Sequence, residues 1–294
     1  MYAITGATGN TGKPITEALL AAGKKVRIIS RSAEKAKELT DKGAELFVGE
    51  TSDSEVLNKA FQGVRAVYVM IPMDWKSDNY TAHQEKHAKA MAEAIRKNGI
   101  KYVVTLSSQG AHLEKDSGVV LGLHKMEQIF NSIEGINVLH LRPSYFMENT
   151  LGMIGLIKQT GIMGSPLKAN LPLDVIATRD IAQYAIKRLL ALDFTNKTHQ
   201  DLLGARSVTY AEMTKVYGSA IGKKDLQYVE FSFNDFKKGL IENMGTSENV
   251  ADNFNAFIKA ANDGKVMIAK RTAESTTPTT IEDFAHTFAF VYQQ

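Results

Sequence analysis

The chain has 294 residues, a formal net charge of +3 and no cysteine. Its length allows one large core with a smaller unit attached, because single cores seldom grow past roughly 250–300 residues. The lack of cysteine excludes disulfides, thiolate nucleophiles and sulfur-ligated zinc. The weak net charge, with both signs interspersed, argues against nucleic acid as the main partner. No apolar run approaches the roughly 20 residues that span a bilayer, and an apolar strand that starts at Tyr2 leaves no room for a signal peptide. We therefore expect a cytoplasmic protein, not a membrane protein.

Up to residue 142, short apolar or β-branched runs alternate with longer segments of helical periodicity. The expected strands are Tyr2–Thr5, Val26–Ser30, Glu45–Val48, Ala66–Ile71, Tyr102–Ser107 and Asn137–Leu141. The segments between them, such as 11–23 and 79–99, read as helices, and several end in a glycine just before the next strand, as in a left-handed C-terminal cap. This order predicts an α/β fold, a doubly wound parallel sheet with helices on both faces.

After Asn149 the pattern changes. A segment rich in Gly, Leu, Ile and Met is followed by a short extended piece, an amphipathic helix from about Thr178, and mostly helices from Thr209 onward. We assign residues 1–149 to the sheet domain, completed by 172–206. Residues 150–171 and 207–294 are assigned to a smaller, mostly helical C-terminal subdomain that supplies a lid or substrate site.

Three glycines, Gly6, Gly9 and Gly12, stand directly behind the first expected strand in the sequence GATGNTGK. Glycine is needed where the backbone turns sharply, where a pyrophosphate approaches it, and where a helix closes on a strand. The amides of Asn10 and Thr11 would then point from the helix N-terminus toward the phosphates. A glycine spacing alone is weak evidence, but the flanking strand and helix favour a dinucleotide-binding loop over a merely tight turn.

The second expected strand ends in Ser30-Arg31-Ser32, where an acidic residue would favour NAD. Arg31 suits a 2′-phosphate, and Lys35 adds a second positive charge one turn further on. We therefore predict NADP(H) in preference to NAD(H); the alternative is a solvated arginine on a loop. Glu50 falls where the adenine would lie, and Ile71 and Pro72 fall near the middle of the dinucleotide.

A typical short-chain dehydrogenase carries Tyr-x-x-x-Lys on the helix after the fifth strand, where the tyrosine protonates the carbonyl oxygen. Here that helix reads LGLHKME, and alignment on Lys125 puts Leu121 in the tyrosine position. A standard alcohol dehydrogenase or sugar-nucleotide epimerase is thus disfavoured. Lys125 could still hold the nicotinamide ribose and His124 could donate a proton; alternatively, both lie on the wet face of the helix.

Two histidines, His83 and His87, share one face of the 79–99 helix. The zinc-protease pattern needs glutamate directly after the first histidine, but position 84 is glutamine and no third ligand is evident. We predict no metal site here.

The chain resembles the NmrA-like branch of the atypical short-chain dehydrogenase/reductase superfamily. The resemblance rests on GATGNTG at 6–12, RSAEK at 31–35, LRPSYFMEN at 141–149, IATRDIA at 176–182, VTYAEM at 208–213 and TPTTIEDFA at 277–285. It implies a Rossmann domain with a small C-terminal subdomain and NADP(H) as the usual nucleotide. It implies phosphate contacts at Thr8, Gly9, Asn10 and Thr11, and a nicotinamide-side wall at Pro143, Ser144 and Tyr145, with Tyr145 a candidate for the chemistry.

Two functions remain open, because such relatives include reductases of flat electrophiles and regulators that bind NADP without turnover. In the first, NADPH delivers hydride to a small planar electrophile such as a quinone, under an apolar lid drawn from residues 146, 147, 153, 154 and 163. The alternative for this Met-rich stretch is that it forms the core of the subdomain. A quinone needs less proton assistance than a ketone, so loss of the tyrosine is tolerable. In the second, the protein is a redox sensor that acts on a protein partner. Either a monomer or a homodimer is compatible with the sequence. Arg142 could be a substrate contact or could pair with a buried carboxylate.

Overall fold

The computed structural model describes residues 1–294, and a seven-stranded parallel sheet forms its centre. The strands are β1 (Tyr2–Thr5), β2 (Val26–Ser30), β3 (Glu45–Val48), β4 (Ala66–Val69), β5 (Tyr102–Leu106), β6 (Asn137–Pro143) and β10 (Lys197–Leu202). Their order is β10-β6-β5-β4-β1-β2-β3, and every neighbouring pair is parallel. The predicted doubly wound sheet is confirmed, with β4 and β5 slightly shorter and β6 longer than expected.

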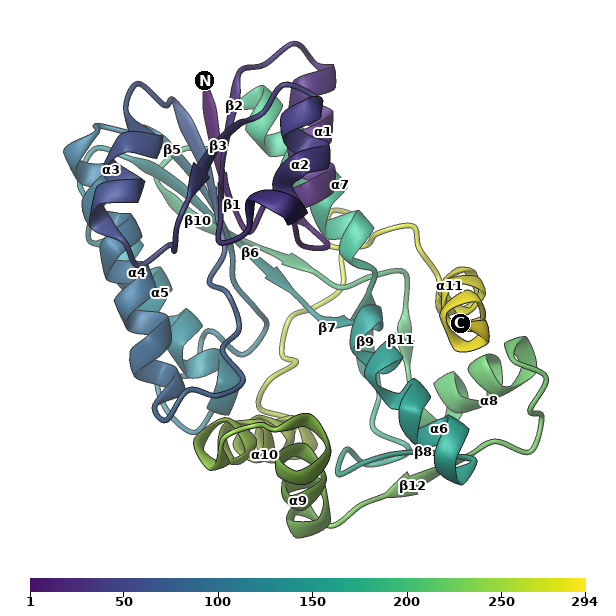
Figure 1. The fold of residues 1–294 in the computed structure, drawn as a ribbon. Coiled ribbons are helices and arrows are strands. Elements are labelled where there is room, and N and C mark those ends of the chain that lie inside the picture. The colour runs from purple at the N-terminus through teal and green to yellow at the C-terminus, as the bar shows by residue number, and fades with distance from the viewer.

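Helices cover both faces of this sheet (Figure 1). One face carries α1 (Gly12–Ala21), α2 (Ala33–Asp41) and α7 (Thr178–Ala191), and the other carries α3 (Ser54–Phe61), α4 (Tyr80–Lys97) and α5 (Leu121–Asn131). Side chains alternate between the two layers along each strand: Ile4 packs in the α1–α7 layer and Ala3 in the α3–α5 layer. Both faces are therefore buried, as the continuous apolar strands require.

Helix ends in this domain follow the predicted pattern. The glycines at 23, 43, 63, 99 and 135 all have positive φ, between 62° and 101°. Each lets the chain leave a helix in the left-handed conformation and enter the next strand. Because all seven strands are parallel, their carboxyl ends lie on one edge of the sheet.

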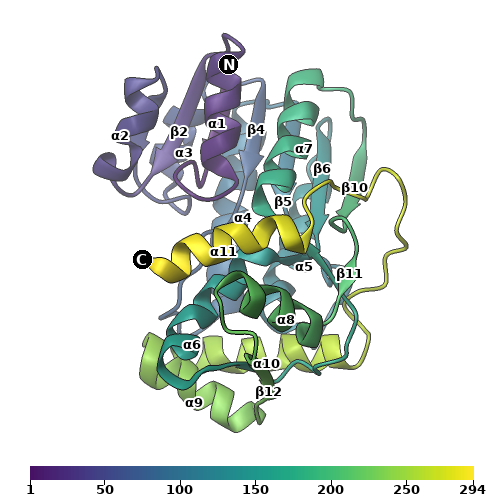
Figure 2. The same ribbon diagram turned by 90° about the vertical axis from the view of Figure 1, so that its right-hand side faces the viewer.

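The C-terminal subdomain has its own core and more strands than expected (Figure 2). Its helical elements are η2 (Met147–Met153), α6 (Ile154–Thr160), α8 (Tyr210–Ala220), α9 (Phe233–Met244), α10 (Glu248–Asn262) and α11 (Ile281–Gln293). Its strands are β7 (Tyr145–Phe146), β8 (Ile162–Ser165), β9 (Leu173–Ile176), β11 (Ser207–Val208) and β12 (Gln227–Glu230), which form a three-stranded sheet, β11-β9-β7, and a two-stranded sheet, β12-β8. At the centre of this core Tyr217 stacks on Phe288 with ring centroids 4.1 Å apart.

Several contacts fix the helical pair α9–α10 to the sheet domain. The short η1 (Gly118–Val120) passes so close to α10 that a Cβ on Gly118 would lie 1.9 Å from the Asn253 carbonyl oxygen. In the loop after β4, the Trp75 carbonyl accepts a 2.8 Å hydrogen bond from the Ser247 amide, and the Trp75 indole stacks on Phe254 at 5.5 Å.

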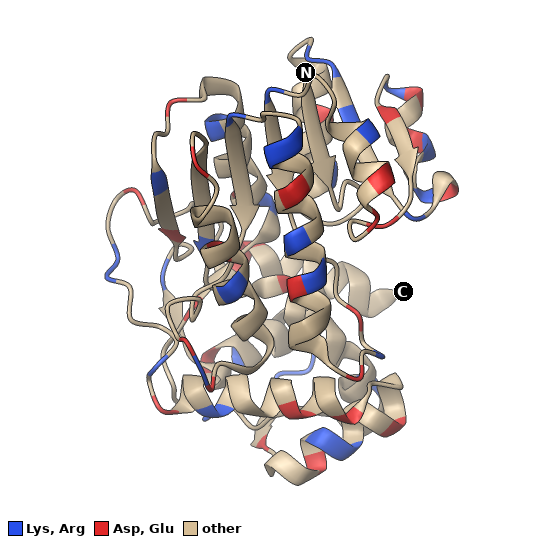
Figure 3. Cartoon of the chain, turned by 90° about the vertical axis from the view of Figure 1, so that its left-hand side faces the viewer, with Lys and Arg blue, Asp and Glu red and all other residues tan.

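Charged residues of both signs are interspersed along the helices of the α4–α5 side (Figure 3). None of the helices combines the length and apolar character needed to cross a membrane.

Candidate functional site

The chain runs outward from β1 through β2 and β3, then returns to β4 beside β1 and continues through β5 and β6. The loops after β1 and β4 therefore diverge, and the crevice at such a point is where open α/β sheets bind ligands. The structure brings the predicted residues to this edge: the glycine loop follows β1, Arg31 follows β2, Glu50 follows β3, and Ile71-Pro72 follows β4. Pro143 and Ser144 lie at the end of β6.

Each glycine of the loop has a different structural reason. Gly6 has φ +62°, and a Cβ there would lie 2.4 Å from the Met70 side chain. A Cβ on Gly12 would lie 2.2 Å from the Gly6 carbonyl oxygen, so this glycine lets α1 close on the loop. A Cβ on Gly9 would meet only that same oxygen, at 3.3 Å, and its other side is open. Gly9 is thus the position at which a ligand can approach the backbone.

The exposed part of the loop presents unpaired donors. Thr8, Gly9 and Asn10 are exposed, and the amides of Asn10 and Thr11 donate to no acceptor in the protein. The Thr11 side chain does not cap α1; its hydroxyl accepts a 3.0 Å bond from the buried Tyr68 hydroxyl. Free amides at a helix N-terminus form an anion site.

Arg31 and Lys35 are both exposed and neither takes part in an ion pair. Between them, Ser32 caps α2 and accepts a 3.2 Å bond from the Lys35 amide. Two exposed cations with no ion-pair partner at the start of a helix are suited to bind an anion. Glu50 is exposed, and Ile71 and Pro72 are half-buried.

The histidine pair supports the loops that border this crevice. His83 Nε2 is 3.0 Å from the Pro72 carbonyl oxygen, and His87 Nδ1 is 2.7 Å from the Thr51 hydroxyl. Burial lowers the pKa of His87 to about 4, with the neighbouring His83 adding to the effect. No group of three His, Asp or Glu side chains is arranged to hold a metal ion.

On α5, Lys125 forms an ion pair with Glu85 of α4, and this contact, together with Lys89, lowers the pKa of the Glu85 carboxyl. His124 Nδ1 is 2.9 Å from the Ala111 carbonyl oxygen, in the loop after β5. Both side chains are half-buried. The roles predicted for Lys125 in ribose binding and for His124 in proton donation remain predictions.

Sequence reasoning did not identify Glu127, a buried carboxylate at the carboxyl ends of β5 and β6. Glu127 is 3% exposed, accepts bonds from Arg142 Nε at 2.9 Å and Nη2 at 2.5 Å, and accepts a third from Ser107 at 2.5 Å. Burial alone would raise the pKa of Glu127, but Arg142, His140 and Ser107 outweigh it and hold that pKa below its usual value. Arg142 thus has the buried partner that the sequence left open, and an arginine inside a strand was the available signal for it.

Tyr145 lies on β7, where the sheet domain meets the subdomain. Its hydroxyl accepts a 2.9 Å bond from Tyr210, the first residue of α8, and Tyr210 stacks on Tyr228 at 4.8 Å. Burial raises the pKa of both Tyr145 and Tyr210, so both remain protonated at neutral pH. Because Tyr210 donates, the proton of Tyr145 is left for another acceptor. Nothing in the local sequence indicates Tyr210, which is brought to Tyr145 by tertiary packing.

The expected apolar lid is wrong for most of its members. Met147 and Met163 are 1% and 0% exposed and Ile154 is 8% exposed, all within the subdomain core, against which Met153 also packs. Phe146 packs against the core of the sheet domain. Their apolar character serves packing, as is usual for Met-rich segments.

A parallel doubly wound sheet with a glycine loop at its switch point defines a Rossmann-type protein. Within that class the NmrA-like family model matches residues 2–285, and the chain belongs to this family.

Three comparisons illustrate the range of its relatives. An NAD(P)H azoreductase from Xenophilus azovorans is 26% identical over 264 residues, which are 89% of this chain and 87% of that protein. The NADPH complex of the Escherichia coli quinone oxidoreductase QOR2 superposes with a TM-score of 0.80 at 20% identity, covering 97% of this chain and 98% of that one. NmrA, a negative transcriptional regulator solved with NADP, superposes with a TM-score of 0.66 at 13% identity, covering 98% and 90%. At these identities the two structures show the shared fold.

Proposed function

We propose that the protein is an NADPH-dependent reductase that transfers hydride to a small planar electrophile such as a quinone. The observation that carries the nucleotide assignment is the pair of anion sites at the crevice: free amides at Asn10 and Thr11, and unpaired cations at Arg31 and Lys35. Their separation into two neighbouring loops fits a pyrophosphate and a 2′-phosphate of one molecule.

The residues present fit this cofactor from end to end. Gly9 lets the pyrophosphate approach, Arg31 and Lys35 bind the 2′-phosphate, and Glu50 borders the adenine. Ile71 and Pro72 line the middle of the crevice, and Pro143 and Ser144 form the wall at its nicotinamide end, with Lys125 the candidate for the ribose. When bound, NADPH supplies hydride from C4 of its nicotinamide.

The chain contributes orientation and a proton. Tyr145 lies directly after the Pro143-Ser144 wall, and Tyr210 fixes its hydroxyl so that the Tyr145 proton is free to reach a substrate oxygen. A quinone that gains hydride at one end needs one proton to become the hydroquinone. Tyr145 is protonated at neutral pH and can hydrogen-bond the oxygen that gains negative charge, although burial makes this phenol a weaker acid than a free tyrosine. His124, bound to Ala111, is the second candidate donor. The azoreductase and quinone oxidoreductase relatives support this class of acceptor.

The test is NADPH oxidation by the purified protein with a panel of quinones and azo dyes, together with calorimetric titration of NADPH, NADP⁺ and NADH. We expect turnover with NADPH that Arg31→Asp abolishes at low NADPH concentration. Selective NADPH binding without turnover on any acceptor would contradict the reductase and favour a sensor, for which the NADP-bound transcriptional regulator is the precedent.

A further inference from the structure

A cavity of about 150 Å³ lies beside the crevice, at the carboxyl ends of β5, β6 and β10. Its lining residues are Gln109, Gly110, His112, Arg142, His199, Asp201, Val266, Ile268 and Ala269. A cavity of this volume can hold one molecule of about the size of benzene. The proposed function uses none of these residues.

The lining carries one negative charge that no group in the protein balances. Arg142 donates two hydrogen bonds to Glu127, so these two charges cancel and the guanidinium is held toward α5. Asp201 is the register partner of Arg142, and both side chains project from the same face of the sheet. The Asp201 carboxylate accepts no hydrogen bond, and the one cationic candidate that approaches it to 4.0 Å is His199 Nε2. With its histidines neutral, the cavity is therefore net negative.

A histidine of the lining adds an acceptor. His112 Nε2 is 3.0 Å from the Lys265 carbonyl oxygen, and because a carbonyl oxygen can only accept, Nε2 carries the hydrogen and Nδ1 is left as an acceptor. The side-chain amide of Gln109 is enclosed by the protein and offers no atom to a ligand. A carboxylate and an imidazole nitrogen are the acceptors that suit a positively charged donor.

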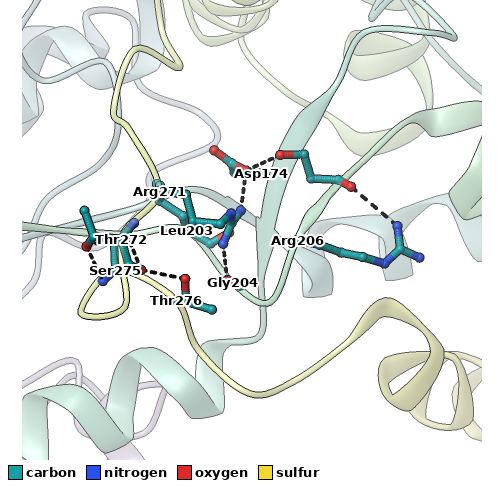
Figure 4. A network of polar contacts seen from close by, with 9 residues as sticks. Asp174, Leu203, Gly204, Arg206, Arg271, Thr272, Ser275 and Thr276 are labelled. Atoms are coloured by element: carbon teal, nitrogen blue, oxygen red, sulfur yellow. Dashed lines mark hydrogen bonds and ion pairs between the residues drawn. The ribbon is translucent and has the colours of Figure 1, made fainter.

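The opposite wall is apolar and held in place. Three residues of the segment that leaves α10 form it: Val266, Ile268 and Ala269. The bond between His112 and Lys265 ties the start of this segment to the loop after β5. Arg271 anchors its far end: the guanidinium donates to the carbonyl oxygens of Leu203, at 3.0 Å, and Gly204, and pairs with Asp174 at 2.5 Å (Figure 4). The segment is therefore fixed on both sides of the apolar wall.

We propose that this cavity binds a primary ammonium group that carries one apolar substituent of about the size of a benzene ring. The ammonium group has three donors, which suit the Asp201 carboxylate and His112 Nδ1, while the substituent packs on Val266 and Ala269. A carboxylate ligand would be repelled by Asp201, and a neutral ligand would leave the Asp201 charge unbalanced. No group of three His, Asp or Glu side chains is placed to hold a metal ion instead. This site does not depend on hydride transfer.

Three ligands of similar shape and different charge test the proposal: 4-fluorobenzylamine, 4-fluorobenzyl alcohol and 4-fluorobenzoate. Each is titrated by ¹⁹F NMR into the full chain, with and without saturating NADP⁺, which occupies the nicotinamide end of the crevice. We expect the protonated amine to bind with a Kd of about a millimolar, as suits so small a ligand, and with the same Kd in both conditions. The alcohol and the benzoate should bind at least about tenfold more weakly.

Two variants of similar chemistry locate the amine. Asp201→Asn keeps the shape of the side chain but removes its charge, so it should weaken the amine at least about tenfold and bring it close to the alcohol. The melting temperature should not fall, because the Asp201 carboxylate makes no hydrogen bond within the protein. Asp225→Asn, at an exposed position before β12, is the matched control and should leave binding unchanged.

Four results would each overturn the proposal. The amine does not bind, or the alcohol or the benzoate binds as tightly as the amine does. NADP⁺ displaces the amine, which would place it in the crevice. Asp201→Asn binds the amine as the unaltered chain does. Asp225→Asn weakens the amine as much as Asp201→Asn, which would show attraction to surface charge alone.

Discussion

The two ends of the crevice are built differently. At the nucleotide end the charged groups are exposed and unpaired, as Arg31 and Lys35 are. At the nicotinamide end they are buried and bonded to one another, as in the group formed by Ser107, Glu127 and Arg142. A substitution at the first end should therefore change ligand binding without changing the stability of the fold. A substitution at the second end should change stability as well, because a buried polar group that loses its partner carries a large energetic cost.

The largest expected effect on stability comes from breaking the buried ion pair between Glu127 and Arg142. Glu127→Leu leaves the Arg142 charge unpaired and should lower the free energy of unfolding by about 3–5 kcal/mol. The double variant Glu127→Leu/Arg142→Leu should recover most of this loss. Asp41→Ala, which removes an exposed pair with Lys37, is the control and should cost under about 1 kcal/mol. Urea denaturation measures all of these, and equal losses in the Glu127 and Asp41 variants would refute the contrast.

The second-largest expected effect is a loss of folding stability at acidic pH, which arises in the same buried region. His140 is 2% exposed, hydrogen-bonded to Thr105 and Asn131, and burial lowers its pKa to about 4. The unfolded chain takes up this proton near pH 6.5 and the folded protein does not until about pH 4, so stability is fully present above pH 6.5 and falls as the pH drops between these values.

At pH 5 we expect His140 to account for about 2 kcal/mol of lost stability. Urea denaturation at pH 7.5 and 5.0 should show that His140→Gln reduces the difference between the two pH values by that amount. His199→Gln, at a half-exposed position, serves as the control. An unchanged pH dependence in His140→Gln would show that the folded protein accepts this proton readily.

Two glycines three residues apart separate fold from binding at the nucleotide end. Gly12→Ala places a methyl group against the Gly6 carbonyl and should destabilise the protein by about 1–3 kcal/mol. Gly9→Ala should leave the melting temperature nearly unchanged but weaken NADPH, because its methyl group occupies the approach of the pyrophosphate. Calorimetry and thermal melting of both variants check this; NADPH affinity retained in Gly9→Ala would place the phosphates elsewhere.

The smallest expected effect is the most selective. Arg31→Ala should weaken NADPH roughly tenfold, about 1.4 kcal/mol, and leave NADH and the melting temperature unaffected. Titration of both nucleotides measures the ratio of their affinities. Equal losses of affinity for NADPH and NADH would contradict the assignment of the 2′-phosphate to Arg31.

Sequence reasoning could propose a nucleotide-binding role for the Gly6–Gly12 loop and Arg31 because the signals for that role are local in the sequence. A glycine spacing, a strand end and a helix cap each lie within a few residues, and the fold confirms the doubly wound parallel sheet that these signals helped to predict. The nicotinamide end depends on distant partners: Glu127 meets Arg142 through the packing of α5 on β6, and Tyr210 meets Tyr145 across 65 residues of chain. A glutamate in a helix looks like a solvent-exposed residue until its burial is known.

The strands missed in the subdomain have the same cause. β8 and β12 are only four residues long, and they pair with each other although β9, α7, β10, β11 and α8 lie between them in the chain. Such short segments carry too few residues for a period of two to be recognised, and their pairing is decided by the core around Tyr217 and Phe288. The Met-rich segment was assigned to a lid because apolar residues indicate burial without showing whether they pack in a protein core or against a ligand.

The chain's single tryptophan lies at the contact between the loop after β4 and α10, with its indole on Phe254 and its carbonyl on Ser247. The protein therefore carries one intrinsic fluorophore at the junction of its two parts. Any movement of the α9–α10 pair relative to the crevice would change the stacking of that ring and hence its emission, so stopped-flow fluorescence would detect such a movement without any attached label.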